Sequence, residues 1–493
     1  MESTIRRMRA LYGTDNWGQG YFDINRSGRL VVLPDLDETE ADVWEIYHEA
    51  RRRGLNPPLL LRFPQILDNQ VSRLYEAFDK SRREFSYSAP YRIVYPLKVN
   101  SQRFVVEEIL RTAKDSHMGI EVGSKAELYL ALGLELAPGS LVVCNGFKDA
   151  SSLRLAVVGA QMDLDVVVVL ERLEDLRLLE GLGDDARKLW VGLRGRLYSR
   201  GAGKWEATGG TTGKFGLSPP DLVHALRVLQ DRGLESRLAM LHFHLGSQVT
   251  DIRRVKAAVK EAARVYAKVH KLGFPVRWLN VGGGLGVDYD GSGSTADSSA
   301  NYALEEYAND IVFNTREICE HEGVPLPHLA SESGRALTAH HAVLLLEAAA
   351  REGAPDPPVG TGQREHPLMA ELEETRRIIN PKNFREYYHD ALQEREELQS
   401  LFELGYLSLE ARARAEAAFR DICRKALEFA RAADAMSEEF ERLQRALRAS
   451  YVANFSVFRS IPDAWAVQQL FPVMPIHRLD EEPDELGILM DLT

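Results

Sequence analysis

Between about residues 65 and 350 the sequence alternates short apolar, strand-like runs with longer segments of helical period. This alternation narrows the possible folds most, because strands separated by helices build parallel sheets with the crossovers packed outside. Eight such strands predict an α/β protein with a (β/α)8 TIM barrel; a doubly wound open sheet is the alternative. The barrel is favoured because chemically unusual residues follow many of the strands, where barrel active sites lie. The expected strands are 91–95, 118–122, 140–144, 165–170, 188–194, 238–244, 277–281 and 328–331, with helices such as 103–114, 124–132, 220–232, 252–271 and 302–321.

The composition describes a large protein without secretion or membrane signals. Its 493 residues are 45% hydrophobic, enough for more than one domain, and the net charge of -12 argues against nucleic acid as the main partner. The three cysteines, Cys144, Cys319 and Cys423, lack CxxC spacing, which predicts neither a disulfide framework nor a zinc site. The N-terminus has no apolar signal core and no run reaches membrane-spanning length, so we expect a cytoplasmic protein without membrane partners.

We expect four regions along the chain. Residues 12–33 alternate aromatic, glycine and apolar positions around a turn at Asn25 to Gly28, which predicts a β-hairpin, and a helix follows at about 40–54. Residues 382–450 predict two or three amphipathic helices in a bundle-like insertion. The predicted division is 1–64 (hairpin and lead-in helix), 65–350 (barrel), 351–450 (linker, about 352–366, and helical insertion) and 451–493 (start of a β-rich domain).

Lys98 lies in the hexapeptide YPLKVN, directly after an apolar strand. A lysine at the end of a buried strand can serve Schiff-base chemistry, because desolvation lowers the pKa of its amine and exposes a nucleophile. It can equally extend its ammonium to solvent as a plain surface charge. Taken alone, the hexapeptide favours the surface charge.

Two histidines end the strand in LHFHLGSQ, residues 241–248. His242 and His244 lie on the same side of the strand by its period of two, and a histidine there could stack on a planar heteroaromatic ring. A metal-binding pair and plain core histidines are the alternatives. Two histidines two residues apart are weak evidence for a metal without a nearby carboxylate.

Glycine and charged residues follow two later strands. In NVGGGLGVDY, Gly282, Gly283 and Gly284 allow the backbone to approach an anion closely; the alternative is a tight connection between strand and helix. In SESGRA, Arg335 could bind a phosphate and Glu332 could pair with a ring nitrogen, unless the two simply form a salt bridge.

Two further loops contain charged residues at or after strand ends. Residues 199–218 are dense in glycine with Arg200, Lys204 and Lys214 interspersed, which is typical of a long functional loop. In GIEVGSKAEL, Glu121 ends a strand, and Ser124 with Glu127 predicts a capping box at the next helix.

Together these residues supply the parts that bind pyridoxal phosphate: an amine (Lys98), a stacking ring (His244), a phosphate site (Gly282 to Gly284 with Arg335) and a partner for the ring nitrogen (Glu332). Their coincidence in barrel order is far less probable by chance than any one of them. In this combination Lys98 is predicted to be the amine that binds the cofactor rather than a surface charge.

The chain resembles biosynthetic arginine decarboxylases, of the alanine-racemase-like class of pyridoxal-phosphate enzymes. The KVN, FHLGS, GGG and Glu-x-Gly-Arg elements are shared with ornithine and diaminopimelate decarboxylases, whereas WGQGYFDIN and the long match at 454–483 favour arginine. The matching segments are WGQGYFDIN, YPLKVN, GIEVGSKAEL, VCNGFKD, SRGAGKW, KFGLS, HFHLGSQ, NVGGGLGVDYDG, SESGRALTAHHAVL and NFSVFRSIPDAWAVQQLFPVMPIHRLDEEP.

The resemblance implies specific roles for the residues that match it. Lys98 would hold the cofactor covalently, His244 would stack on its ring and Glu332 would pair with the ring nitrogen. Ser247, Gly283, Gly284 and Arg335 would hold the phosphate, with Gly282 beside them. The 279–289 segment would belong to the substrate and cofactor region, with Leu279, Asn280, Val281, Leu285, Gly286, Val287, Asp288 and Tyr289 as substrate-binding candidates.

The implied activity is decarboxylation of L-arginine to agmatine and carbon dioxide, in arginine catabolism and in putrescine and spermidine biosynthesis. The resemblance also implies a homodimer or larger homo-oligomer and a bound Mg²⁺, although the sequence shows no magnesium-ligand motif. Ornithine, lysine or diaminopimelate is the alternative substrate.

A Cys-Asp-Ser-Asp-Gly motif follows a DLT-like stretch in this family, and this sequence stops at Asp491-Leu492-Thr493. That cysteine and its acidic neighbours are assigned to protonation and substrate recognition across the dimer interface. We therefore expect a truncated member with an incomplete β-rich domain. An inactive cofactor-binding fragment or regulatory protein is the alternative function.

Overall fold

The computed structural model describes residues 2–36, 39–114, 117–197, 216–352, 366–483 and 486–492. It divides into two compact units, and each is described by itself. One comprises Met1–Leu345 with Ile461–Glu482, and the other comprises Leu346–Ser460 with Pro483–Thr493.

Eight parallel strands close into a barrel in the first unit, each paired with its neighbour in the sequence and the last paired with the first. All eight expected strands are present, so the predicted (β/α)8 barrel is confirmed and the open sheet is wrong. The strands are β5 (Tyr91–Pro96), β6 (Gly119–Val122), β7 (Leu141–Cys144), β8 (Asp165–Leu170), β9 (Trp190–Arg194), β10 (Leu238–His242), β11 (Trp278–Asn280) and β12 (His328–Ser331).

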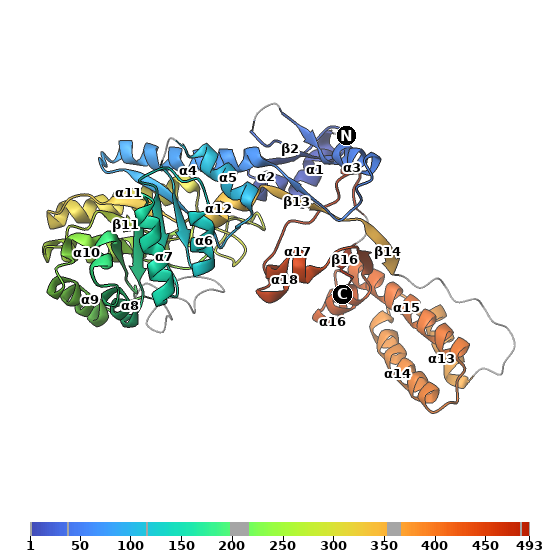
Figure 1. The fold of residues 1–493 in the computed structure, drawn as a ribbon. Helices are drawn as coiled ribbons and strands as arrows, with labels where there is room; N and C mark the ends of the chain where they lie inside the picture. Colours follow the sequence, from blue (N-terminus) through green and yellow to red (C-terminus); the bar gives the residue numbers. More distant parts are fainter. Residues whose placement is uncertain are drawn as a thin grey trace. The chain divides into compact units, whose positions relative to one another are not determined.

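Helices connect these strands and surround the barrel (Figure 1). Helix α10 (Ile252–Lys271) shows why they form: Asp251 caps its first turn, and its apolar stripe, which includes Val255 and Val259, is buried. Each fully buried valine or leucine contributes about 1.5–3 kcal/mol relative to an exposed one. The others are α4 (Pro64–Glu84), α5 (Arg103–Thr112), α6 (Lys125–Leu132), α7 (Ala150–Gln161), α8 (Leu173–Glu180), α9 (Pro219–Asp231) and α11 (Leu304–Glu322), with short 3-10 turns at Gly183–Lys188 and Glu235–Arg237.

A small layer of apolar side chains fills the barrel interior. Because side chains alternate between the two faces of a strand, this layer identifies the inward-facing row of most strands. Its buried members are Val94, Leu141, Val143, Val167, Val169, Met240, Trp278 and Ala330.

The N-terminal segment is more helical than the sequence predicted. The hairpin forms between β1 (Phe22–Ile24) and β2 (Leu30–Val32), and β3 (Ala41–Asp42) and helix α3 (Val43–Arg52) follow. The extension of the hairpin back to residue 12 is wrong, because α1 (Glu2–Tyr12) and α2 (Thr14–Trp17) occupy this region. Gly13, with φ of 67°, turns the chain between these helices, and the buried Trp17 donates its indole N–H to the Tyr12 carbonyl at 2.7 Å.

Two further elements connect the ends of the barrel segment. Strand β4 (Leu59–Arg62) precedes the barrel and pairs antiparallel with β13 (Ala342–Leu345), which follows β12 and the short helix α12 (Gly334–Thr338). The segment 461–482, with α18 (Pro462–Ala466), belongs to this same unit: the Leu470 N–H donates to Ser298 at 3.1 Å, and Phe471 lies edge-on to Tyr289.

The second unit contains a helical bundle and a small sheet. The prediction of two or three helices over 382–450 is confirmed, since three lie there: α14 (Phe384–Glu403), α15 (Leu409–Ala432) and α16 (Glu438–Ala446). A fourth helix of the described bundle, α13 (Pro367–Ile378), precedes this range and was not predicted. These helices share one apolar core that includes Leu372, Ala391 and Ile422. The sheet consists of β14 (Ala348–Glu352), β15 (Ala449–Ala453) and β16 (Gly487–Met490). The short helix α17 (Val457–Ser460) lies between β15 and β16 in the chain. The expected four-part division of the chain stays a prediction.

Candidate active site

A ring of polar side chains caps the apolar layer of the barrel at the carboxyl ends of the strands. Every member lies two residues beyond an inward-facing position, so its side chain faces the barrel axis. The pairing places His242 directly beside Arg194 and Asn280. The ring consists of Glu121, Asn145, Glu171, Arg194, His242, Asn280 and Glu332, and Lys98 extends the row beyond the end of β5.

Lys98 pairs with a fully buried carboxylate. Its Nζ lies 3.1 Å from Oε1 and 3.0 Å from Oε2 of Glu121; the Lys98 side chain is 47% exposed and that of Glu121 is 0% exposed. Desolvation lowers the pKa of Lys98, but the carboxylates of Glu121 and Glu332 outweigh it and raise the pKa above its ordinary value. The expected lowered pKa is therefore wrong as a net result, because the two carboxylates outweigh the effect of burial. Burial, and then the charge of Glu332, raises the pKa of Glu121 to about 7.

The polar contacts of Glu332 all lie at one of its two carboxylate oxygens. The amide nitrogens of Asn145 and Asn280 each lie 3.0 Å from Oε1, and Nε2 of His242 lies 3.2 Å from the same atom. Oε2 is buried and has no hydrogen-bond partner among the described residues. Burial favours a raised pKa for Glu332, but His242 and the Lys98 ammonium hold it below its ordinary value, so this side chain is an anion.

The same amide of Asn145 also donates to Glu121, with its nitrogen 3.0 Å from Oε1. The two buried carboxylates are thereby linked from β6 to β12 through a side chain that follows β7. Because the amide has two N–H donors, both are used.

On the opposite side of the ring, Arg194 donates to Glu171 at 3.1 Å. The backbone N–H of Gly146 reaches the same carboxylate oxygen at 2.8 Å, and the buried Lys148 ammonium donates to the Gly146 carbonyl at 2.7 Å. Burial lowers the pKa of Lys148. This cluster fixes the loop that carries Asn145.

His244 lies just past β10 and accepts a hydrogen bond at Nδ1 from the Gly246 N–H at 2.9 Å. Burial and the Arg194 charge lower its pKa to about 3, so the imidazole is neutral at neutral pH. A neutral ring is suited to stacking on an electron-poor aromatic ring. The alternative of a metal-binding pair gains no support, because no group of three or more His, Cys, Asp or Glu within the described ranges could hold a metal ion.

The glycine turn packs tightly against this histidine. Gly282 has φ of 68°, and a Cβ there would lie 2.2 Å from the Phe243 carbonyl oxygen; a Cβ on Gly283 would lie 3.1 Å from Nε2 of His244. Gly284 also has a positive φ, 115°. Side chains at these positions would displace the loop that carries His244.

Arg335 does not pair with Glu332, so the simple salt bridge between them is wrong. Its guanidinium donates to Ser247 Oγ, with Nη2 at 3.0 Å and Nε at 3.2 Å, and to the Tyr289 hydroxyl at 3.0 Å. A guanidinium, a hydroxyl and a glycine turn at one end of the barrel are the groups that bind a phosphate.

The predicted substrate-binding residues lie in different environments. Asn280 contacts Glu332, and Tyr289 contacts Arg335. Val287 and Asp288 are held by Gln248 and Ser299, and the Gly286 N–H donates to Tyr302. Three of them, Leu279, Val281 and Leu285, are buried in the main apolar core. A role in substrate binding stays a prediction for the whole set.

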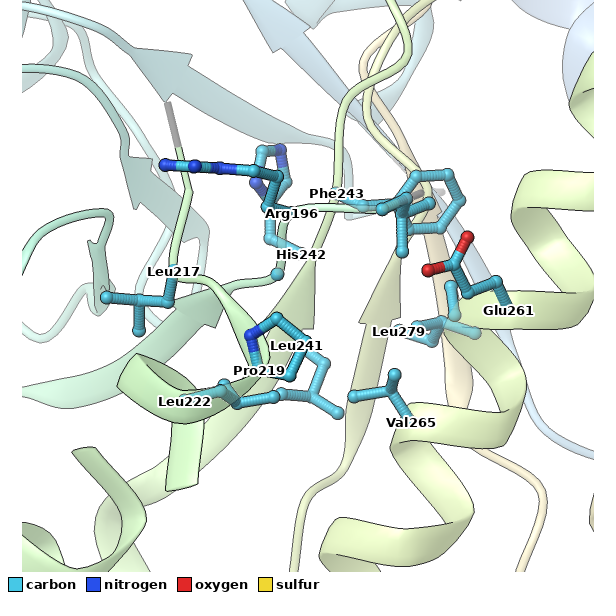
Figure 2. A pocket seen from close by; sticks show the side chains of 13 residues that line it. Arg196, Leu217, Pro219, Leu222, Leu241, His242, Phe243, Glu261, Val265 and Leu279 are labelled. Carbon is cyan, nitrogen blue, oxygen red and sulfur yellow. The ribbon is translucent and has the colours of Figure 1, made fainter. Parts of the chain in front are cut away.

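An apolar cavity lies on the outer side of β10 and β11, between these strands and helices α9 and α10 (Figure 2). Leu241 and Leu279 face it, whereas the neighbouring Asn280 points inward to the ring. Leucine and valine side chains dominate its lining, and we do not place the active site there. The predicted loop with Arg200, Lys204 and Lys214 and the linker at 352–366 lie almost wholly outside the described residues.

Sequence reasoning missed Asn145, Glu171 and Arg194. The signal was present: each lies two residues after an inward-facing residue of its strand (Val143, Val169 and Gly192). Extending the period of two beyond the strand ends would have identified all three.

The residues present fit pyridoxal phosphate. The unpartnered Oε2 of Glu332 matches a protonated ring nitrogen, Lys98 offers an amine, and the neutral His244 offers a stacking ring. Ser247, Arg335 and the glycine turn match the phosphate.

No helix among the described residues is long and apolar enough to cross a membrane.

Comparisons with known proteins agree with this geometry. Residues 71–339 match the model of the pyridoxal binding domain of pyridoxal-dependent decarboxylases, and residues 362–444 match the arginine decarboxylase helical bundle domain. A biosynthetic arginine decarboxylase from Nostoc sp. is 41% identical over 492 residues, covering 99% of this chain and 72% of the relative. One from Deinococcus radiodurans is 42% identical over 489 residues, covering 98% and 74%.

Solved structures show the same similarity. The crystal structure of biosynthetic arginine decarboxylase from Campylobacter jejuni has a TM-score of 0.84 and 34% identity, covering 98% of this chain and 78% of that chain. Diaminopimelate decarboxylase from M. jannaschii, with a TM-score of 0.53 and 21% identity, covers 68% of this chain and 72% of its own and shares the fold alone.

Proposed function

The chain belongs to the biosynthetic arginine decarboxylase family, and we propose that it converts L-arginine to agmatine and carbon dioxide with pyridoxal phosphate. The observation that carries the proposal is the pair of chemical groups at the carboxyl ends of the strands: an amine, Lys98, paired with a buried carboxylate, and a second carboxylate, Glu332, with one unpartnered oxygen. The reaction would serve arginine catabolism and polyamine biosynthesis.

The cofactor, when bound, supplies an electron sink for the bond between the α-carbon and the leaving carboxylate. Lys98 would hold it covalently, which requires a neutral amine, and Glu121 lies 3.0 Å away to accept the ammonium proton. Oε2 of Glu332 would hold a proton at the ring nitrogen, and Oε1 is already occupied by the two asparagine amides.

His244 would stack on the ring, and Ser247, Arg335 and the glycine turn would bind the phosphate. Such groups act by orientation and by a fixed electrostatic environment. We give Mg²⁺ no role in this proposal. A cytoplasmic location and a homodimer or larger assembly stay predictions from the sequence.

The test is to add pyridoxal phosphate to the purified chain and measure carbon dioxide release from L-arginine, L-ornithine, L-lysine and diaminopimelate. We expect kcat/KM to be highest for arginine. Preference for another of these amino acids would overturn the substrate assignment. A chain that binds the cofactor without turnover of any of them would overturn the proposed activity and support a cofactor-binding fragment.

A further inference from the structure

Asn145 occupies a special place in the ring. It is 7% exposed, and its single amide nitrogen lies 3.0 Å from Oε1 of Glu121 and 3.0 Å from Oε1 of Glu332. It is the one side chain among the described residues that hydrogen-bonds both carboxylates. Neither carboxylate lies on the strand that precedes Asn145: one is on β6 and the other follows β12.

Two carboxylates buried close together repel each other, and each needs donors to stay ionised. Lys98 provides donors for Glu121 and Asn280 provides one for Glu332, whose Oε1 also lies 3.2 Å from Nε2 of His242. Each of these partners contacts only one of the two carboxylates. Only the Asn145 amide fixes the position of one carboxylate relative to the other.

We propose that Asn145 is a positioning residue that couples the amine end of the site, Lys98 and Glu121, to the ring end, Glu332. It holds Glu121 against Lys98 as the proton acceptor while it saturates Oε1 of Glu332 and leaves Oε2 for the cofactor ring. This inference rests on the proposed function, because both ends matter only where an amine and a ring nitrogen are used together.

The coupling predicts how the site responds to pH. A hydrogen bond to the ionised form of Glu121 favours that form, so removing the Asn145 amide raises the pH at which Glu121 ionises. Other titratable and charged groups also face this part of the site and are unchanged by the substitution: Lys98 after β5, Cys144 on β7, Arg194 on β9, His242 and His244 at the end of β10, and Tyr307 on α11.

The experiment measures attachment of pyridoxal phosphate to the cofactor-stripped chain as a function of pH, by the absorbance of the Lys98-bound cofactor. Attachment joins Nζ of Lys98 to the cofactor's aldehyde carbon and releases water, so it needs the amine proton removed. In Asn145→Ala we expect the midpoint of the rate to rise by about one pH unit, which slows attachment about tenfold at pH 6.

Asn280→Ala is the matched control. It removes an amide from Oε1 of Glu332 at the same distance of 3.0 Å but touches no oxygen of Glu121, so the midpoint should shift by much less than the roughly one pH unit expected for Asn145→Ala. Equal midpoint shifts in the two variants would overturn the proposal. If Asn145→Ala does not fold, Asn145→Leu, which is close in shape, uncharged and without donors, replaces it.

A double variant distinguishes coupling from a merely structural role. In the Glu121→Gln background, where no Glu121 inflection remains, Asn145→Ala should leave the attachment rate at pH 6 unchanged; a further slowing of about tenfold, as in the wild type, would overturn the proposal. Wild-type protein that does not attach the cofactor would instead contradict the proposed function. The two failures are therefore distinguishable.

Discussion

The barrel and the helical bundle each contain a glutamate whose pKa is raised to about 7, for different reasons. Glu121 in the barrel is fully buried and faces another carboxylate, but a lysine and an asparagine amide also contact it. Glu394 on α14 is raised by burial and by neighbouring acidic groups, Glu371 and Asp390, and its contact in the described bundle is the Thr375 hydroxyl at 3.5 Å. A shifted pKa alone does not identify an active site; the barrel differs because its carboxylate has an amine to exchange a proton with.

The largest expected effect is that of Lys98→Ala. Without the amine the cofactor has no covalent attachment, and we expect arginine decarboxylation to fall by roughly a thousandfold or more. Carbon dioxide release measures this. Lys125→Ala is the control, since the exposed Lys125 donates to Ser151 on α7 and lies outside the ring. Similar losses in both variants would contradict the assignment.

Glu332→Gln tests the ring end of the site. The substitution keeps the shape but removes the anion at Oε2, and we expect kcat to fall about 100-fold with the chain still folded. Glu394→Gln, the same chemical change in the bundle, should leave kcat unaltered. An unchanged kcat in Glu332→Gln would show that the unpartnered oxygen has no part in the chemistry.

Glu121→Gln tests the proton acceptor through its pH profile. Because the pKa of Glu121 is raised to about 7, its ionised form increases as pH rises through 7, and the wild-type attachment rate should rise in the same window. In the variant this inflection should disappear, with attachment about tenfold slower at pH 8. Persistence of the inflection would assign it to another group.

Glu394→Gln should change stability rather than activity. Its folded-state pKa of about 7 exceeds the ordinary value of 4.5, so the folded protein binds more protons between these values and loses stability as pH rises through this window. After allowance for solvent screening of this partly buried group, we expect the variant to be about 1 kcal/mol more stable than wild type at pH 8. At pH 4 the two should unfold alike in urea, and a constant difference at both pH values would exclude this cause.

The sequence predicted the barrel well because each strand is bounded by a helix whose period differs clearly from that of the strand. It also placed Lys98, His244, Glu332 and Arg335 after strands, and the structure brings them to one end of the barrel. It did not predict that Glu332 bonds Asn145 and Asn280 rather than Arg335, because which of several donors reaches a carboxylate depends on strand stagger around the barrel.

Two other misses have local causes. Tyr12 ends α1, Trp17 ends α2, and Gly13 and Gly18 flank α2. This spacing of aromatic residues and glycines also suits a hairpin, so the pattern alone did not distinguish the two structures. Helix α13 begins at Pro367, directly after the predicted linker at 352–366, and no helix was predicted before residue 382. Proline fits the first turn of a helix, which lacks partners for its N–H groups.

The pairing of β12 with β5 delays closure of the barrel during synthesis of the chain. Tyr91 pairs with Leu329, which is synthesised about 240 residues later, so the barrel cannot close before then. At about 5–20 residues per second of translation, β5 stays without this neighbour for roughly 10 to 50 s. During that interval Lys98, Glu121 and Asn145 have already left the ribosome, but Glu332 has not. The nascent chain therefore carries the amine half of its chemistry well before it carries the half that would hold the ring.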